Sequence, residues 1–220
     1  TEALIACYEA TSDQKFLDRA LLVADKICNR AAGQTQGLVW EHFDENWTPQ
    51  LDFDNDNEAL KIFRPWGFQP GHQVEWARFL ITLNHYAPNI WFLPKARYLF
   101  DVATKHAWDP EHGGLAYSFD PEGTVCNWDK IFWVQCESIG TAAMLAAVTK
   151  QDEYWAHYER LWKYSWRTFV DHQHGSWHRR MNRVHEKHFP EKTKLSLCVD
   201  PDFHILGAFA GAIMMLDAHT

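Results

Sequence analysis

The sequence has a deficit of basic residues. Lys and Arg number 21 against 29 Asp and Glu, which gives a formal net charge of −8. Proteins that bind a nucleic-acid backbone or an anionic membrane surface use clustered basic residues, so this composition argues against both partners. The longest apolar stretch, residues 205–216, includes two glycines and is shorter than the ~20 residues that cross a bilayer.

Cysteine is also scarce, and the sequence lacks the common catalytic fingerprints. The five cysteines are odd in number and include no C-x-x-C pair. Neither a disulfide framework nor a structural zinc site is expected, and a reducing, cytoplasmic location is favoured. H-E-x-x-H, G-x-S-x-G, Walker and dinucleotide-binding motifs are all missing, and no spacing of histidines supports a metal site.

Tryptophan and histidine, in contrast, are abundant, with 12 and 13 residues respectively. Aromatic faces that stack on sugar rings and imidazoles that move protons are typical of a carbohydrate pocket. An aromatic-rich core with surface histidines accounts for the same counts equally well. Composition alone therefore leaves both interpretations open.

Helical periodicity organises most of the chain into pairs of helices with short breaks between them. The predicted helices are residues 2–10, 14–30, 71–86, 90–108, 130–148, 152–170 and 202–218. The connections at 37–44, 114–120 and 175–181 each begin with glycine and alternate apolar with polar residues, which predicts short hairpins near 37–43, 114–119 and 175–181.

This repeated unit predicts an all-α protein of the (α/α)6-barrel, or toroid, type with a site at the end that carries the long loops. No linker composition interrupts the chain, so residues 1–220 are expected to form one catalytic domain. Three pairs and one helix make only part of a ring, and the chain starts at Thr1 rather than at Met. We therefore expect N-terminal helix pairs to be missing, and expect the first helix to expose Leu4, Ile5 and Tyr8.

The strongest candidate site residue is His72, which follows Pro70 and Gly71 in the first turn of a predicted helix. Glu75 lies one turn further on the same face and could fix the imidazole tautomer. A helix N-terminus disfavours imidazolium, so a neutral, basic His72 is expected. The alternative is a capping histidine with a solvated glutamate.

Two further predicted helices contribute candidates. His204 is expected in the first turn of the last helix, where the alternative is a satisfied core histidine. Glu137 is embedded in an apolar helix with Trp133 on the same face, and it must face either a cavity or another helix because buried polar groups need partners. A glycoside hydrolase would need a carboxylate pair, for which Glu75 and Glu137 are the candidates.

Three segments resemble the N-acylglucosamine 2-epimerase superfamily, which includes mannose isomerase-type aldose–ketose isomerases. The segments are Pro70-Gly71-His72-x-x-Glu75-Trp76-Ala77-Arg78, Phe132-Trp133-Val134-Gln135-Cys136-Glu137 and Asp202-Phe203-His204. The resemblance runs along nearly the whole chain, and the Arg64-Pro65-x-Gly67 stretch is closest to the mannose isomerase type. Glu41-His42-Phe43-Asp44 is also similar.

The resemblance implies a cofactor-free enzyme in which His72 and His204 exchange protons with an opened monosaccharide. Arg64 or a protonated histidine is the candidate donor to the enediolate. We expect one cavity to be surrounded by Arg64, His72, Glu75, Trp128, Trp133, Glu137 and His204. A sugar 2-epimerase of the N-acylglucosamine or cellobiose type is the first alternative function. An α/α-barrel glycoside hydrolase and a non-catalytic interaction protein stay open, as does a homo-oligomer.

Overall fold

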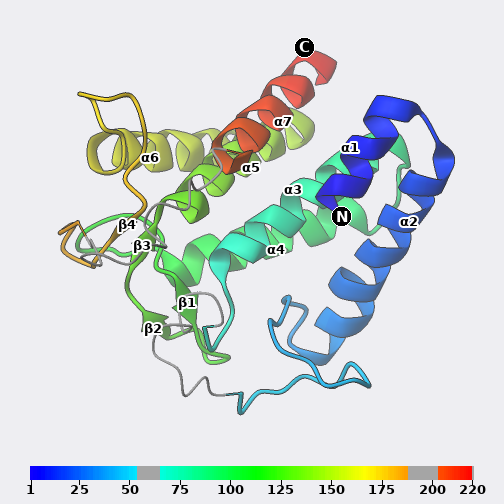
Figure 1. Ribbon diagram of the computed structural model, residues 1–220, viewed down its shortest axis with the longest axis horizontal. Helices are drawn as coiled ribbons and strands as arrows, with labels where there is room; N and C mark the ends of the chain where they lie inside the picture. The colour runs from blue at the N-terminus through cyan, green and yellow to red at the C-terminus, as the bar shows by residue number, and fades with distance from the viewer. Residues whose placement is uncertain (54–64, 188–202, 220) are drawn as a thin grey trace.

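The computed structural model describes residues 1–53, 65–187 and 203–219, and these residues are predominantly helical (Figure 1). The α-helices are α1 (Glu2–Thr11), α2 (Gln14–Ala24), α3 (Pro70–Tyr86), α4 (Phe92–Ala107), α5 (Phe132–Thr149), α6 (Asp152–Thr168) and α7 (Phe203–His219). The all-α prediction is confirmed, and the helix boundaries differ from the predicted ones by one or two residues, except at the end of α2.

The helices form an inner and an outer row. Helix α5 packs against α3 on one side and α7 on the other, while α4 and α6 pack behind α3 and α5. Helix α1 joins the inner row through the edge-to-face contact of Tyr8 with Tyr86 of α3, at 5.2 Å between ring centroids. Its partner α2 lies outside it (Figure 1). This arrangement is an arc of an α/α toroid.

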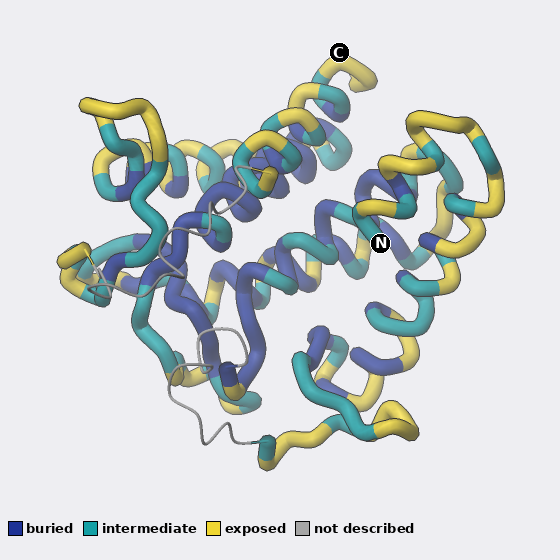
Figure 2. The backbone as a smooth tube through the Cα atoms, in the orientation of Figure 1, coloured by how far each residue is buried: buried dark blue, intermediate teal, exposed yellow. Residues whose placement is uncertain are grey.

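Burial follows this arrangement. Helix α5 is apolar all round and is buried along nearly its whole length, whereas the inner α1 and α7 at the two ends of the arc are much more exposed (Figure 2). Close approach of the inner helices requires glycine at two positions. A Cβ on Gly71 of α3 would lie 2.3 Å from the Trp133 ring, and one on Gly140 of α5 would lie 2.6 Å from the Ala208 carbonyl oxygen.

The predicted helix 14–30 is continuous but not uniform. The Asp13 side chain caps its first turn by accepting a hydrogen bond from the Lys15 amide at 3.1 Å. From Asp25 to Ala31 the helix widens into a π-helix, and a 3₁₀ turn (Ala32–Gln34) ends it. Periodicity predicts the helix correctly but does not resolve this change of winding.

The β-structure differs from the predicted hairpins. Strand β1 (Ser118–Phe119) pairs with β2 (Val125–Asn127), so this hairpin extends beyond the predicted residues. Strand β4 (Arg180–Met181) pairs with β3 (Lys130–Ile131), which precedes α5, and Met181 also forms a single bridge with Lys187, beyond the predicted residues. Within 37–43 there is only a single bridge, from Phe43 to Pro49. Side-chain alternation identifies extended backbone but not its pairing partner.

The expected exposure of α1 is wrong, because Ile5 is buried and Leu4 and Tyr8 are half-buried against the core. Among the inner helices, α7 exposes large apolar side chains instead, at Leu206 and Ile213. None of the described helices is long and apolar enough to cross a membrane.

Candidate active site

The inner helices α3, α5 and α7 bring their N-terminal turns together, and these turns carry most of the predicted site residues. His72 and Glu75 come from α3, Trp133 and Glu137 from α5, and His204 from α7. The Glu75 carboxylate lies 3.9 Å from His72 Nε2 and 3.7 Å from His204 Nδ1. One side chain thus reaches both imidazoles, so the rings are well within the ~15 Å that a bound hexose and its contacts could bridge.

His72 is held by a carboxylate from the loop that follows α2. Glu41 Oε2 lies 2.8 Å from His72 Nδ1. Burial alone would lower the pKa of His72, but the charge and hydrogen bond of Glu41, with smaller contributions from Glu75 and Glu137, raise it to about 9. The prediction of a neutral His72 with Glu75 behind it is wrong, because the carboxylates outweigh the helix N-terminus and Glu75 faces the other ring nitrogen.

His204 is held by the fully buried Glu137 of α5. The distance from His204 Nδ1 to Glu137 Oε1 is 2.8 Å, and the His204 side chain is 19% exposed. A histidine that donates its Nδ1–H to a carboxylate keeps Nε2 available as an acceptor. The arrangement therefore leaves Nε2 as the nitrogen that can take a proton.

Glu75 occupies the space between the two histidines. Burial and the nearby Glu137 carboxylate raise the pKa of Glu75 to about 7, although His72, His204 and Arg78 act in the opposite direction. This carboxyl group can therefore gain or lose a proton near neutral pH.

Trp133 packs against both imidazoles. Its ring lies 5.2 Å from that of His204, nearly parallel at 26°, and 5.2 Å from that of His72 at 36°. The indole in turn lies against Gly71, where only a residue without a Cβ leaves room for it. Trp133 thereby fixes the orientation of both rings.

Two site residues were not singled out in the sequence. Glu41 lies in the stretch that resembles the family, and Arg78 closes the motif that begins at Pro70. Arg78 falls at the same three-residue spacing as His72 and Glu75, which places all three on one face of α3. That spacing was the signal that could have identified it.

Two predicted residues remain. Arg64 lies outside the described residues, and Trp128 packs elsewhere. The Trp128 ring packs under the guanidinium of Arg183 at 3.9 Å and near the Lys130 ammonium at 5.6 Å. Both cations also bond the buried Asp109 carboxylate, so in the described residues Trp128 belongs to an ion-pair network that ties the loops together.

A metal ion would find three potential ligands here, because one atom each of Glu75, Glu137 and His204 lie within 4.8 Å of one another. However, both oxygens of Glu137 already accept hydrogen bonds, from Arg78 and from His204. A metal cation would have to compete for Glu137 with the Arg78 guanidinium, which already supplies positive charge there. The three side chains therefore fit a metal ion poorly.

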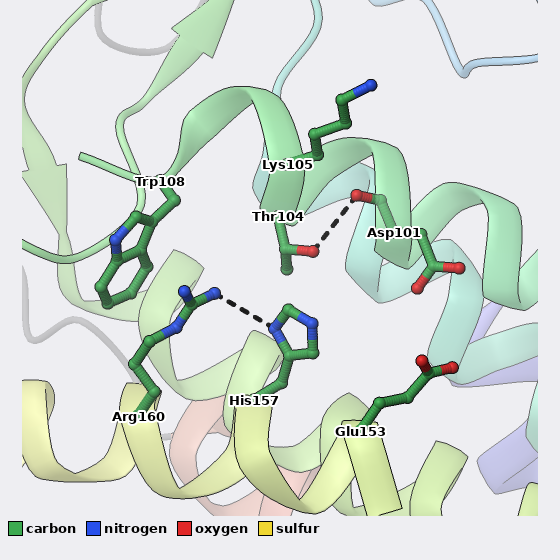
Figure 3. A pocket seen from close by; sticks show the side chains of 7 residues that line it. All are labelled: Asp101, Thr104, Lys105, Trp108, Glu153, His157 and Arg160. Carbon is green, nitrogen blue, oxygen red and sulfur yellow. Dashed lines mark hydrogen bonds between the residues drawn. The ribbon is translucent and has the colours of Figure 1, made fainter. Parts of the chain in front are cut away.

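A cavity lies away from this cluster, between the outer helices α4 and α6 (Figure 3). It has a volume of about 330 Å³. The Arg160 guanidinium in this cavity already contacts neighbouring side chains, because it stacks on Trp108 at 4.0 Å and lies 3.3 Å from His157 Nδ1. We therefore place the candidate site at the histidines.

An arc of helix pairs whose inner helices begin around two carboxylate-held histidines defines an α/α-toroid protein with a candidate acid–base site. Residues 1–208 match the sequence profile of N-acylglucosamine 2-epimerase (GlcNAc 2-epimerase). The chain belongs to this family, and the resemblance inferred from its motifs is confirmed.

Known relatives include isomerases and epimerases. The chain is 44% identical over 209 residues to the D-mannose isomerase of Marinomonas mediterranea, which covers 94% of this chain and 52% of that protein. A crystal structure of D-mannose isomerase matches 98% of this chain and 54% of its own with a TM-score of 0.87 at 42% identity. Cellobiose 2-epimerase from Spirochaeta thermophila shares the fold, with a TM-score of 0.76 at 17% identity over 99% of this chain and 50% of its own. The chain thus spans about half the length of these relatives.

Proposed function

We propose that this chain carries the acid–base site of an aldose–ketose isomerase that interconverts sugars of the mannose and fructose type. The observation that carries the proposal is the pair of imidazoles, each held at Nδ1 by its own glutamate, on either side of Glu75. Similarity to D-mannose isomerase, at 44% identity, supports the choice of substrate.

In the proposed reaction His204 acts as the base on the opened sugar. Its Nε2 removes the proton from C2 of the aldose, and the C–H electrons form the C1–C2 double bond of an enediolate as the carbonyl electrons move onto O1. His204 then returns its proton to C1. The protonated His72 donates a proton to O1 and receives the proton of O2, which leaves a hydroxyl at C1 and the carbonyl at C2. General acid–base transfer by one positioned residue contributes on the order of 10²–10⁴ in rate.

His72 supplies the acid. With a pKa of about 9 it carries a proton at neutral pH, and a charged donor stabilises the negative oxygen that develops at O1. The same group could protonate the ring oxygen when the sugar opens. Since only protons move, this chemistry needs no cofactor.

The alternative functions fit less well. Epimerisation would need the proton to return to the opposite face of C2, and relatives named for that reaction are less similar: N-acylglucosamine 2-epimerase of Mus musculus is 29% identical over 52% of this chain, and the cellobiose 2-epimerase is 17% identical. A glycoside hydrolase needs two carboxyl groups that face the sugar, whereas Glu137 is fully buried and bonded to Arg78 and His204. A purely structural or interaction role would not require buried carboxylates beside two histidines, because such groups are costly to bury.

We further propose that residues 1–220 form part of one larger catalytic toroid, because the relatives are about twice as long. A cytoplasmic location is supported by the four described cysteines, none of which is in a disulfide. Self-association of the whole protein stays open.

The proposal is tested by incubating the full-length protein with mannose, fructose or glucose, with and without a metal chelator, and identifying the products by NMR. We expect mannose and fructose to interconvert at a rate that the chelator does not change. Formation of C2 epimers only, or dependence on added metal, would contradict the proposal.

A further inference from the structure

Arg78 lies behind the candidate base and touches neither imidazole through any contact found among the described residues. It is on the same face of α3 as His72 and Glu75, and its side chain is only 8% exposed. The Nε atom donates to Glu137 Oε2 at 2.9 Å, and Nη2 donates to Glu2 Oε1 of α1 at 2.8 Å. One guanidinium thus links α1, α3 and α5 directly behind His204.

Glu137 depends on this guanidinium for its charge. Its side chain is completely buried, and a buried carboxylate stays ionised only when it is paired and hydrogen-bonded. Glu137 Oε2 accepts a hydrogen bond from Arg78 Nε. Glu137 Oε1 bonds His204 Nδ1 and also lies 3.5 Å from Arg78 Nη2. The negative charge of Glu137 is therefore divided between a permanent cation and an imidazole.

Glu41 provides an internal comparison. It holds His72 through the same Nδ1–carboxylate contact, but its Oε1 is buried with no hydrogen-bond partner in the structure described. In the described part of the chain, Glu137 bonds a guanidinium as well as its histidine, whereas the second oxygen of Glu41 has no such partner. The two similar histidine–glutamate pairs thus differ at the second carboxylate oxygen.

We propose that Arg78 is a positioning residue that makes His204 the base. It holds Glu137 as an ionised, oriented acceptor for the Nδ1–H of His204 and offsets the charge that would otherwise stabilise the imidazolium form. His204 then stays in the tautomer with a free, basic Nε2. The inference rests on the proposed function, because it explains which of the two histidines removes the proton.

The charged groups around this pair come from three helices. Glu137 is on α5, Glu75 and Arg78 are on α3, and Glu2 on α1 binds the outer arm of Arg78. The protonated His72 also faces this group, since its Nε2 lies 3.9 Å from the Glu75 carboxylate. Arg78 is the cation that bonds Glu137 directly. Its removal leaves the carboxylates of Glu75 and Glu137 beside His204 without that cation, and negative charge favours imidazolium. The acidic limb of the pH–rate profile should therefore move to higher pH.

The test compares wild type, Arg78→Met and Arg78→Lys in the full-length protein. For Arg78→Met we expect kcat to fall by ~10–100-fold, the range typical of residues that orient a site's working groups, with little change in KM. The acidic limb of the kcat/KM profile should move to higher pH. Arg78→Lys should partly restore both kcat and the position of the acidic limb, because lysine restores the positive charge but not the two hydrogen bonds of the guanidinium. Arg97→Met, which removes an exposed helical arginine from α4, is the matched control and should leave the profile unchanged.

A second readout does not require turnover. Nitrogen-15 chemical shifts of the imidazoles report the tautomer and charge of each histidine. We expect His204 to be Nδ1-protonated in wild type and to gain imidazolium character at neutral pH in Arg78→Met, or in Arg78→Lys if the methionine variant does not fold. Identical His204 shifts and pH profiles in wild type and the Arg78 variants would overturn the inference. A wild-type protein that turns over no sugar would instead refute the proposed function, and the shifts would still decide the role of Arg78.

Discussion

At the scale of single residues, the site is built from two histidines of different electrostatic character. In the described part of the chain, the second oxygen of the carboxylate on His72 has no hydrogen-bond partner, whereas that of the carboxylate on His204 bonds Arg78. We propose that this difference makes His72 the acid and His204 the base. Both histidines occupy the first turn of an inner helix. The difference between them therefore comes from the side chains around each ring and not from their place in a helix.

Replacing Glu41 by Gln tests the assignment of the acid. The pKa of His72 should fall from about 9, because the opposing effect of burial is no longer outweighed to the same extent. The alkaline limb of the pH–rate profile should then move to lower pH. An alkaline limb that is the same in wild type and in Glu41→Gln would show that His72 is not the acid.

The same shift predicts a pH-dependent stability. A histidine whose pKa is raised on folding stabilises the folded state below its unfolded value of 6.5, and this stabilisation is lost as pH rises through about 9. Urea unfolding of wild type should show a free energy of unfolding that decreases as the pH rises through this window. Glu41→Gln should show a smaller decrease. Because the His72 side chain is 38% exposed, the effect is expected to be modest.

Replacing His204 by Asn tests the base. Asparagine keeps similar size and hydrogen bonding but cannot cycle a proton at neutral pH. We expect kcat to fall on the order of 10²–10⁴-fold, while binding of the sugar measured by calorimetry changes little. A variant that turns over at the wild-type rate would move the base to His72 or Glu75.

Sequence reasoning predicted which helix turns carry the chemistry but not all the contacts between them. His72, Glu75, Trp133, Glu137 and His204 were singled out, and the structure brings them together. Glu41 was not weighed as the partner of His72, because the two are 31 positions apart and nothing local indicates that they meet. Glu75, at i+3, was the only partner that helical spacing could propose.

At the scale of elements, the close packing of α3 on α5 positions the site. Gly71→Ala would place a Cβ 2.3 Å from the Trp133 ring, so either the indole or the start of α3 must shift. Overpacking of this kind costs about 1–3 kcal/mol, and the displaced Trp133 and His72 should reduce kcat. Gly33→Ala is the matched control, because nothing lies within 4 Å of its added Cβ. Equal stability and activity of the two variants would contradict this account.

Helices were more predictable than strands for a physical reason. The helical pattern depends on neighbours three and four positions apart, so sequence alone locates α3 to α7 closely. The pairing of β3 with β4 joins loops about 50 positions apart, with Lys130 opposite Met181. Such long-range pairing leaves no local signal in either loop.

At the scale of the whole molecule, α7 presents an exposed apolar stripe. Phe203, Leu206 and Ile213 fall on one face of the helix and are 44%, 68% and 59% exposed. Helix α5, at the centre of the inner row, has no such face. A stripe of this kind indicates a surface that another element covers, in agreement with a chain that spans about half of its relatives.

Polar substitution should reveal this surface. In the 220-residue chain, Leu206→Glu combined with Ile213→Glu should reduce self-association measured by sedimentation velocity, because it removes the exposed stripe. In the full-length protein the same change should lower stability. Ile90→Glu is the control, since Ile90 is 93% exposed but lies outside α7. The same degree of association in all three proteins would show that the stripe is not an interface.

The central claim is that the chain's histidines move protons between C2 and C1 of a sugar, and deuterium incorporation tests it most directly. The full-length protein is incubated with mannose in heavy water over many turnovers, and the recovered sugars are examined by NMR. We predict deuterium at C2 of mannose and at C1 of fructose, and neither conversion nor exchange in the His204→Asn variant. Interconversion that leaves both carbons free of deuterium would indicate a hydride shift and would contradict the account.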